Sequence, residues 1–160
     1  MILVLLGTFV TDFKRPLVEI ERLCEEGIIT EEVIVQSGYT VFNEARHLTL
    51  RAFISPVEMA ELHRRARVVI THAGAGSVTN AIKAEKKVIA IPRLAKYGEH
   101  VDDHQLEILH ELAALNYILP WHDHVPLEEV LTKLDNFEPR SFIPGRSNMI
   151  NYLINYVDSL

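Results

Sequence analysis

The chain has 160 residues, of which 48% are hydrophobic, a formal net charge of −6 and one cysteine, Cys24. This length and apolar content are enough to bury the core of a single domain, and no shift in composition marks an internal boundary. The negative charge argues against non-specific binding to nucleic acid and against electrostatic adsorption to anionic lipid. A lone cysteine excludes an internal disulfide and is expected to be an inert helix thiol.

The sequence contains no apolar run of about eighteen residues, the length that spans a bilayer. The opening stretch, residues 1–6, lacks the basic leader and the cleavage site of a secretory signal peptide. We therefore expect a cytoplasmic protein.

Apolar β-branched runs alternate with helix-like segments along the whole chain. The predicted strands are Ile2 to Leu6, Glu32 to Gln36, Thr49 to Phe53, Val68 to Thr71, Val88 to Ile91 and Tyr117 to Leu119. The predicted helices are Pro16 to Glu26, Pro56 to Arg65, Val78 to Glu85, Val101 to Leu115 and Leu127 to Leu134. This alternation is typical of the α/β class and predicts a doubly wound, mainly parallel Rossmann-like sheet.

Residues 1–136 are expected to form the Rossmann-like domain, and residues 137–160 a linker with a C-terminal helix. The segment Phe137 to Pro144 is a proline-bearing linker, and Asn148 to Leu160 has apolar residues on more than one helix face. Two interpretations stay open for this helix. It packs on its own sheet, or it docks a partner subunit.

A glycine-rich turn, His72-Ala73-Gly74-Ala75-Gly76, follows the fourth predicted strand. Its glycines let a ligand approach the backbone, and Ser77 is expected to cap the next helix. Unpaired N–H groups at the helix start would then face a diphosphate. The plain alternative is an ordinary tight turn. The dinucleotide fingerprint G-x-G-x-x-G fits worse, because it would need glycine where Thr79 stands.

Polar side chains crowd the loop after the fifth predicted strand. They are Arg93, Lys96, Glu99, His100, Asp102, Asp103, His104 and Gln105. Because the carboxyl ends of parallel strands meet at one edge of a sheet, we expect this loop beside the glycine-rich turn. Two alternatives are a solvated helix start and a metal site made by His100, Asp103 and His104, which has no cysteine partner and no H-E-x-x-H motif.

The segments THAGAGS, IPR and KYGEHVDDHQ together resemble the donor-binding domain of family 28 glycosyltransferases, which have the two-domain GT-B fold. VLLGTF, QSGYT and MAEL also fit, so the resemblance covers about residues 1–120. The likeness is closest to small one-domain members. These are the PssE-type exopolysaccharide glycosyltransferase subunits and the catalytic subunit of the eukaryotic transferase that adds the second N-acetylglucosamine to dolichol-linked oligosaccharide.

The resemblance implies a UDP-sugar-dependent hexosyltransferase and a set of donor-binding residues. Gly7 and Thr8 would lie beside the phosphates, and His72, Gly74, Ala75, Gly76 and Ser77 would hold the diphosphate. Glu99, His100, Asp103, His104 and Gln105 would face the sugar, and Arg93 or Lys96 would offset the charge of departing UDP. For Arg93 the alternative is a surface ion pair. Asn80 stands where related domains usually have a ribose-binding Glu, a departure that keeps an acceptor oxygen but loses the charge.

The resemblance also implies a partner, because GT-B enzymes close two halves around donor and acceptor and this chain resembles one. We expect a second, membrane-associated polypeptide to bring a lipid-linked saccharide acceptor and the general base, for polysaccharide or glycolipid biosynthesis at the cytoplasmic face of the membrane. No catalytic residue is assigned to this chain, and no metal or cofactor is expected. A homodimer in isolation is possible. The alternative is a non-catalytic nucleotide-sugar-binding or regulatory module that stabilises a glycosyltransferase partner.

Overall fold

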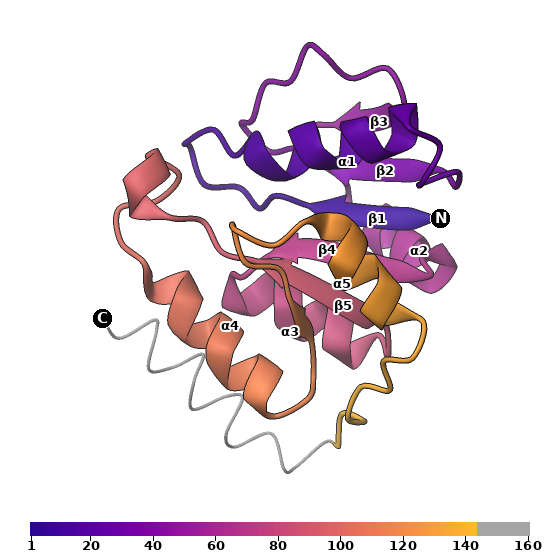
Figure 1. Cartoon of the computed structure of the whole chain (residues 1–160), viewed down its shortest axis with the longest axis vertical. Coiled ribbons are helices and arrows are strands. Elements are labelled where there is room, and N and C mark those ends of the chain that lie inside the picture. The colour runs from indigo at the N-terminus through magenta and orange to yellow at the C-terminus, as the bar shows by residue number, and fades with distance from the viewer. Residues whose placement is uncertain (144–160) are drawn as a thin grey trace.

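A computed structural model describes residues 1–143 and shows one parallel sheet with helices on both faces (Figure 1). The strands are β1 Ile2–Leu5, β2 Val33–Gln36, β3 Leu48–Arg51, β4 Val68–His72, β5 Lys87–Ile91 and β6 Leu119–Pro120. They form a six-stranded sheet of order β3-β2-β1-β4-β5-β6, and every neighbouring pair is parallel. The predicted doubly wound α/β fold is confirmed, whereas the predicted C-terminal helix lies outside the described residues.

The helices are α1 Arg15–Glu25, α2 Pro56–Arg65, α3 Ala75–Lys83, α4 His104–Ala114 and α5 Leu127–Leu134, with a short 3₁₀ turn, η1, at Ala95–Tyr97. Alternate residues of a strand point to opposite faces. Ile2 and Val4 of β1 therefore pack in the core beneath α1 and α5, while Leu3 and Leu5 pack in the core beneath α2, α3 and α4. Burial on both faces explains why the central strands are continuous apolar runs.

Three elements start two residues or more away from the sequence prediction. α3 starts at Ala75, not Val78, because Gly74 takes the extended N-cap conformation, so Ser77 lies inside the first turn and is not the cap. α4 starts at His104, not Val101, because the chain before it turns at Gly98, which has a φ of +68°. The last strand is Leu119–Pro120 and follows a turn at Asn116, which has a φ of +61°.

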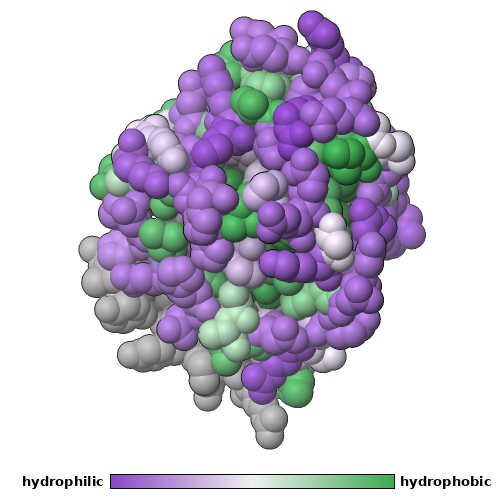
Figure 2. All heavy atoms as spheres, viewed as in Figure 1, coloured by the Kyte–Doolittle hydropathy of each residue, from purple (hydrophilic) through white to green (hydrophobic). Residues whose placement is uncertain are grey.

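The surface seen in the same view is mostly hydrophilic, with hydrophobic residues in small separate patches (Figure 2). Several large apolar side chains that are exposed lie after strand carboxyl ends: Tyr39, Val41 and Phe53 in loops, and Val57 in the first turn of α2. Within residues 1–143, no helix has both the length and the hydropathy needed to cross a bilayer.

Candidate functional site

The strand order places the topological switch point of the sheet between β1 and β4, because the chain leaves these neighbouring strands toward opposite sides of the sheet. In doubly wound sheets the ligand crevice lies at the carboxyl ends of the two strands at this point. Gly7 follows β1 with a φ of +77°, and a Cβ atom built on it would lie 2.6 Å from Nε2 of His72. A Cβ atom on Gly74 would lie 2.1 Å from Cε1 of the same ring. The His72 imidazole therefore fills the space between two glycines, and the structure brings these predicted residues together.

Hydrogen bonds define the tautomer of His72. Its Nδ1 accepts the backbone N–H of Gly74 at 3.1 Å, with the amide nitrogen of Gln105 3.4 Å away. Nε2 then carries the hydrogen and donates to the Ser77 hydroxyl at 3.1 Å. Burial, followed by the nearby charge of Arg93, lowers the pKa of His72 to about 4. At neutral pH the ring is uncharged and acts to hold the turn in shape.

The start of α3 presents open backbone donors. Gly74 has a φ of −78° and a ψ of 133°, and no side chain caps the helix. The N–H group of Val78 donates to the Gly74 carbonyl at 3.1 Å, which is the first hydrogen bond within the helix. The N–H groups of Ala75, Gly76 and Ser77 come before it and have no acceptor within the helix. A Cβ atom on Gly76 would meet no heavy atom within 4 Å. An uncapped helix start beneath open space is suited to binding an anion such as phosphate.

Arg93 follows β5 and is only 1% exposed, so the alternative of a surface ion pair is wrong. Its guanidinium donates to the carbonyls of Leu6 at 2.9 Å, Thr11 at 3.0 Å and Glu99 at 3.0 Å. The loops around Arg93 enclose its side chain. The guanidinium therefore supports these loops and is not exposed to contact a ligand at the surface. Lys96 is exposed instead, and its ammonium pairs with Asp123 at 2.6 Å.

Glu99 and Gln105, two residues predicted to face a sugar, are 4% and 7% exposed. The Glu99 carboxylate pairs with Arg15 at 2.8 Å and accepts the N–H of Leu94 at 3.0 Å. The Gln105 side-chain oxygen accepts the N–H of Arg93 at 3.0 Å. The polar atoms of both residues therefore hold the loop in place.

His100 and His104 lie at the rim of this loop and remain partly exposed. The His100 ring stacks on Phe9, with centroids 4.6 Å apart, and its Nδ1 is 3.1 Å from Asp102. Asp103 accepts the N–H of Ala95 at 2.8 Å. Within the described chain, the ligand atoms close enough to hold a metal ion belong to Glu21, Glu25 and His47, not to His100, Asp103 and His104.

Asn80 follows Gly76 by about one helical turn of α3 and is exposed. It lines an open groove of about 570 Å³ between α3 and α2. The other lining residues are Pro56, Met59, Ala60, His63, Arg64, Ala84 and Lys86. Asn80 is the one predicted donor-binding residue among those that line this groove.

Three residues to which no role was assigned from the sequence also shape the site, Gly38, Thr11 and Phe13. Gly38 has a φ of +57°, and a Cβ atom on it would lie 2.2 Å from the Gly7 carbonyl oxygen. The Phe13 ring lies 4.7 Å from the Arg93 guanidinium carbon, and Thr11 bonds Arg93 and Glu99. For Gly38, a glycine two residues after a predicted strand was a usable signal. For Thr11 and Phe13 there was none.

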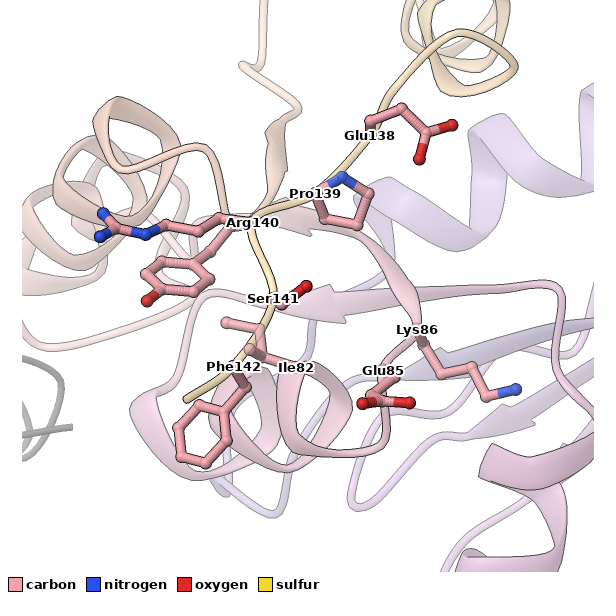
Figure 3. Close-up of a pocket in the computed structure, with 9 residues that line it drawn as sticks. Ile82, Glu85, Lys86, Glu138, Pro139, Arg140, Ser141 and Phe142 are labelled. Atoms are coloured by element: carbon pink, nitrogen blue, oxygen red, sulfur yellow. The ribbon is translucent and has the colours of Figure 1, made fainter. Parts of the chain in front are cut away.

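A separate hollow of about 260 Å³ lies at the other edge of the sheet (Figure 3). The segment Glu138 to Phe142 packs there against Ile82, Glu85, Lys86 and Tyr117. Glu85 and Lys86 come just before β5, so this hollow is at the amino ends of the strands. It shares no wall with the crevice between β1 and β4.

The sheet order and the crevice define a Rossmann-like α/β domain, the architecture of one half of a GT-B glycosyltransferase. The chain belongs to glycosyltransferase family 28, since residues 1–151 match the model of the "Glycosyltransferase family 28 C-terminal domain". The family predicted from the sequence is thereby confirmed.

A curated relative is the "UDP-N-acetylglucosamine transferase subunit ALG13" of Candida albicans, 32% identical over 88 residues. That segment is 55% of this chain but 27% of the Candida protein. An NMR solution structure of ALG13 superposes with a TM-score of 0.62 at 15% identity, covering 98% of this chain and 96% of that one.

Two larger glycosyltransferases share the fold. SnogD from Streptomyces nogalater has a TM-score of 0.60 at 16% identity, with 98% of this chain and 39% of SnogD covered. Acinetobacter baumannii MurG has a TM-score of 0.58 at 19% identity, with 98% of this chain and 49% of MurG covered. The chain thus spans less than half of each of these two proteins, and the likeness concerns the fold alone.

Proposed function

We propose that this chain is the donor-binding, transferase-competent part of a UDP-sugar glycosyltransferase. The observation that carries the proposal is the uncapped start of α3, where the N–H groups of Ala75, Gly76 and Ser77 precede the first intrahelical bond and Gly76 has open space beside its Cα. Backbone donors at a helix start suit a diphosphate. Family membership supports the transferase class, and the name of the Candida relative supports UDP-N-acetylglucosamine as the first donor to test.

In this proposal the diphosphate lies over the turn from Gly74 to Ser77, with Gly7 and Thr8 on its other side. Two features favour this placement. Gly76 leaves room for close approach, and the Ser77 hydroxyl, which accepts from His72, keeps its own hydrogen free to donate. The ribose would lie in the groove beside Asn80. The sugar would be met by the rim of the β5 loop, where His100 and His104 are partly exposed, with Arg93, Glu99, Asp103 and Gln105 supporting that loop.

The proposal assigns the acceptor to a second polypeptide, which brings the lipid-linked saccharide, supplies the general base and recruits this chain to the cytoplasmic face of the membrane. The word "subunit" in the name of the Candida relative supports a two-chain arrangement. We further propose that donor binding is metal-independent, because the helix start can offset the charge of departing UDP without a cation.

Calorimetry of the chain with UDP and with a panel of UDP-sugars, in EDTA and then in Mg²⁺, tests this proposal. We expect UDP to bind equally well in both buffers and one sugar to bind best. No binding of UDP or any UDP-sugar, with the partner absent or present, would refute the donor role.

A non-catalytic module is the second candidate, and the observation favouring it is Asn80, which removes a charge from the expected ribose position. A transfer assay with partner and acceptor separates the two. Sugar transfer supports the enzyme, whereas donor binding without transfer supports the module.

A further inference from the structure

Arg93 is among the largest fully buried side chains of the protein, at 1% exposure. Burying a guanidinium is unfavourable unless its charge and its donors find partners. Here Nη1 donates to the Thr11 carbonyl, the Thr11 hydroxyl and the Glu99 carbonyl, and Nη2 donates to the Leu6 carbonyl. The Phe13 ring lies against the cation. Within residues 1–143, no carboxylate forms an ion pair with it, so backbone dipoles, a hydroxyl and a π face make its direct contacts. The charges of Glu99 and Asp12 act on it from further away, and its Nε has no hydrogen-bond partner among these residues.

These bonds join segments that lie far apart in the sequence. Leu6 follows directly after β1 and Thr11 lies in the same loop, whereas Glu99 belongs to the loop after β5. The Thr11 hydroxyl donates to the Glu99 carbonyl at 2.6 Å, which closes the same contact. The N–H of Arg93 bonds Gln105, whose amide nitrogen is 3.4 Å from Nδ1 of His72. One residue thus connects both loops and reaches the glycine-rich turn through α4.

We propose that Arg93 is the positioning residue of the donor site, fastening the loop after β1 to the loop after β5 and placing a buried positive charge behind the turn that holds the diphosphate. The inference rests on the proposed function for its ligand and on the observed contacts for its geometry. Such a charge favours an anion without touching it, because the low dielectric of the interior screens it weakly.

The pKa of His72 is sensitive to the charge of Arg93. The groups that face it are Arg93 and His100 from the β5 loop, Gln105 from α4 and Ser77 from α3. Burial is the largest cause of its lowered pKa, and the charge of Arg93 is the next. Removing that charge should therefore raise the pKa of His72, whereas Arg93→Lys, which keeps the charge but loses the planar fork of donors, should leave it low.

The test compares Arg93→Gln and Arg93→Lys with Arg46→Gln, a control that removes an exposed arginine. Two readouts need no ligand: the pKa of His72 by NMR, and the hydrogen-exchange rates of amides in residues 8–13 and 94–99. We expect both variants to speed exchange and only Arg93→Gln to raise the pKa. UDP affinity should fall about tenfold or more in Arg93→Gln and less in Arg93→Lys. The control should match the wild type throughout.

A folded Arg93→Gln protein with unchanged exchange and an unchanged His72 pKa would overturn the proposal. If that variant does not fold, Thr11→Val removes one hydroxyl from the contact and leaves the charge in place. Faster loop exchange with an unchanged His72 pKa then supports the proposal, and unchanged exchange refutes it. Failure of the wild type to bind UDP would remove the proposed function, while the two ligand-free readouts would still decide the role of Arg93.

Discussion

Replacing Gly76 with Asp should separate ligand binding from folding. A side chain at this position meets no heavy atom within 4 Å, so the fold does not oppose it. Asp in the first turn of a helix gains about 0.3–1 kcal/mol from the helix dipole, and replacing a helical glycine gains up to about 1 kcal/mol more. We therefore expect the melting temperature to stay the same or rise.

UDP binding should change in the opposite direction. A carboxylate about 5 Å from a phosphate charge, at an effective dielectric constant of about 20, is repelled by roughly 3 kcal/mol. An energy of that size weakens binding by more than about a hundredfold. Calorimetry with UDP and thermal denaturation of the same preparation measure the two effects, and Gly76→Asn is the matched control that adds the same bulk without the charge.

Three outcomes are informative. If Gly76→Asp weakens UDP binding and Gly76→Asn does not, the electrostatic explanation is supported. Equal losses in Gly76→Asp and Gly76→Asn would show that crowding, not charge, dominates, and would refute the estimate. Wild-type affinity in Gly76→Asp would remove this residue from the site.

Three further results are expected. Gly38→Ala should destabilise the protein by about 3 kcal/mol in urea denaturation, because the new side chain combines a positive φ with a clash against Gly7. The control Gly27→Ala has a positive φ but open space around it, and it should destabilise the protein by only about 1 kcal/mol. Equal losses of stability in the two variants would contradict this reasoning. Because the pKa of His72 is about 4 in the folded state, the unfolded state binds more protons between pH 6.5 and pH 4, so stability should fall by up to about 3 kcal/mol as the pH drops through this window. His72→Asn should flatten that dependence in pH-resolved denaturation, and an equally steep curve would show that other groups cause it. Asn80→Glu should strengthen UDP binding several-fold in calorimetry if Asn80 contacts the ribose hydroxyls, and an unchanged affinity would place the ribose elsewhere.

The strands and the doubly wound parallel sheet were accessible from the sequence because burial on both faces produces continuous β-branched runs, as in residues 68–71 and 88–91. α2 was predicted with its observed bounds since its start carries local signals. Ser55 accepts the N–H of Glu58, and Pro56 opens the helix.

The start of α3 was not accessible in the same way. A serine near a helix start usually indicates a cap, but the helix begins three residues before Val78 and leaves its first N–H groups open. Helix starts usually have a side chain that accepts hydrogen bonds from the first backbone N–H groups. The start of α3 departs from this pattern at the place where we propose that a ligand binds.

The roles of Arg93 and Glu99 depend on long-range contacts. A charged residue after a strand and a proline is usually exposed, and nothing near Arg93 in the sequence indicates that Leu6 and Thr11 will surround it. Glu99 is paired with Arg15, which lies 84 positions away along the chain. The sequence could predict that these residues gather at the carboxyl ends of neighbouring strands. Which of them are buried supports of the loops and which stay exposed required the three-dimensional contacts.

The central claim is that UDP binds over the turn between β4 and α3, and a UDP titration followed by backbone amide NMR tests it most directly. The account predicts the largest shifts at Gly7, Thr8 and Gly74 to Ser77, without added metal. Shifts confined to the hollow lined by Glu138 to Phe142, or no shifts at millimolar UDP, would contradict it.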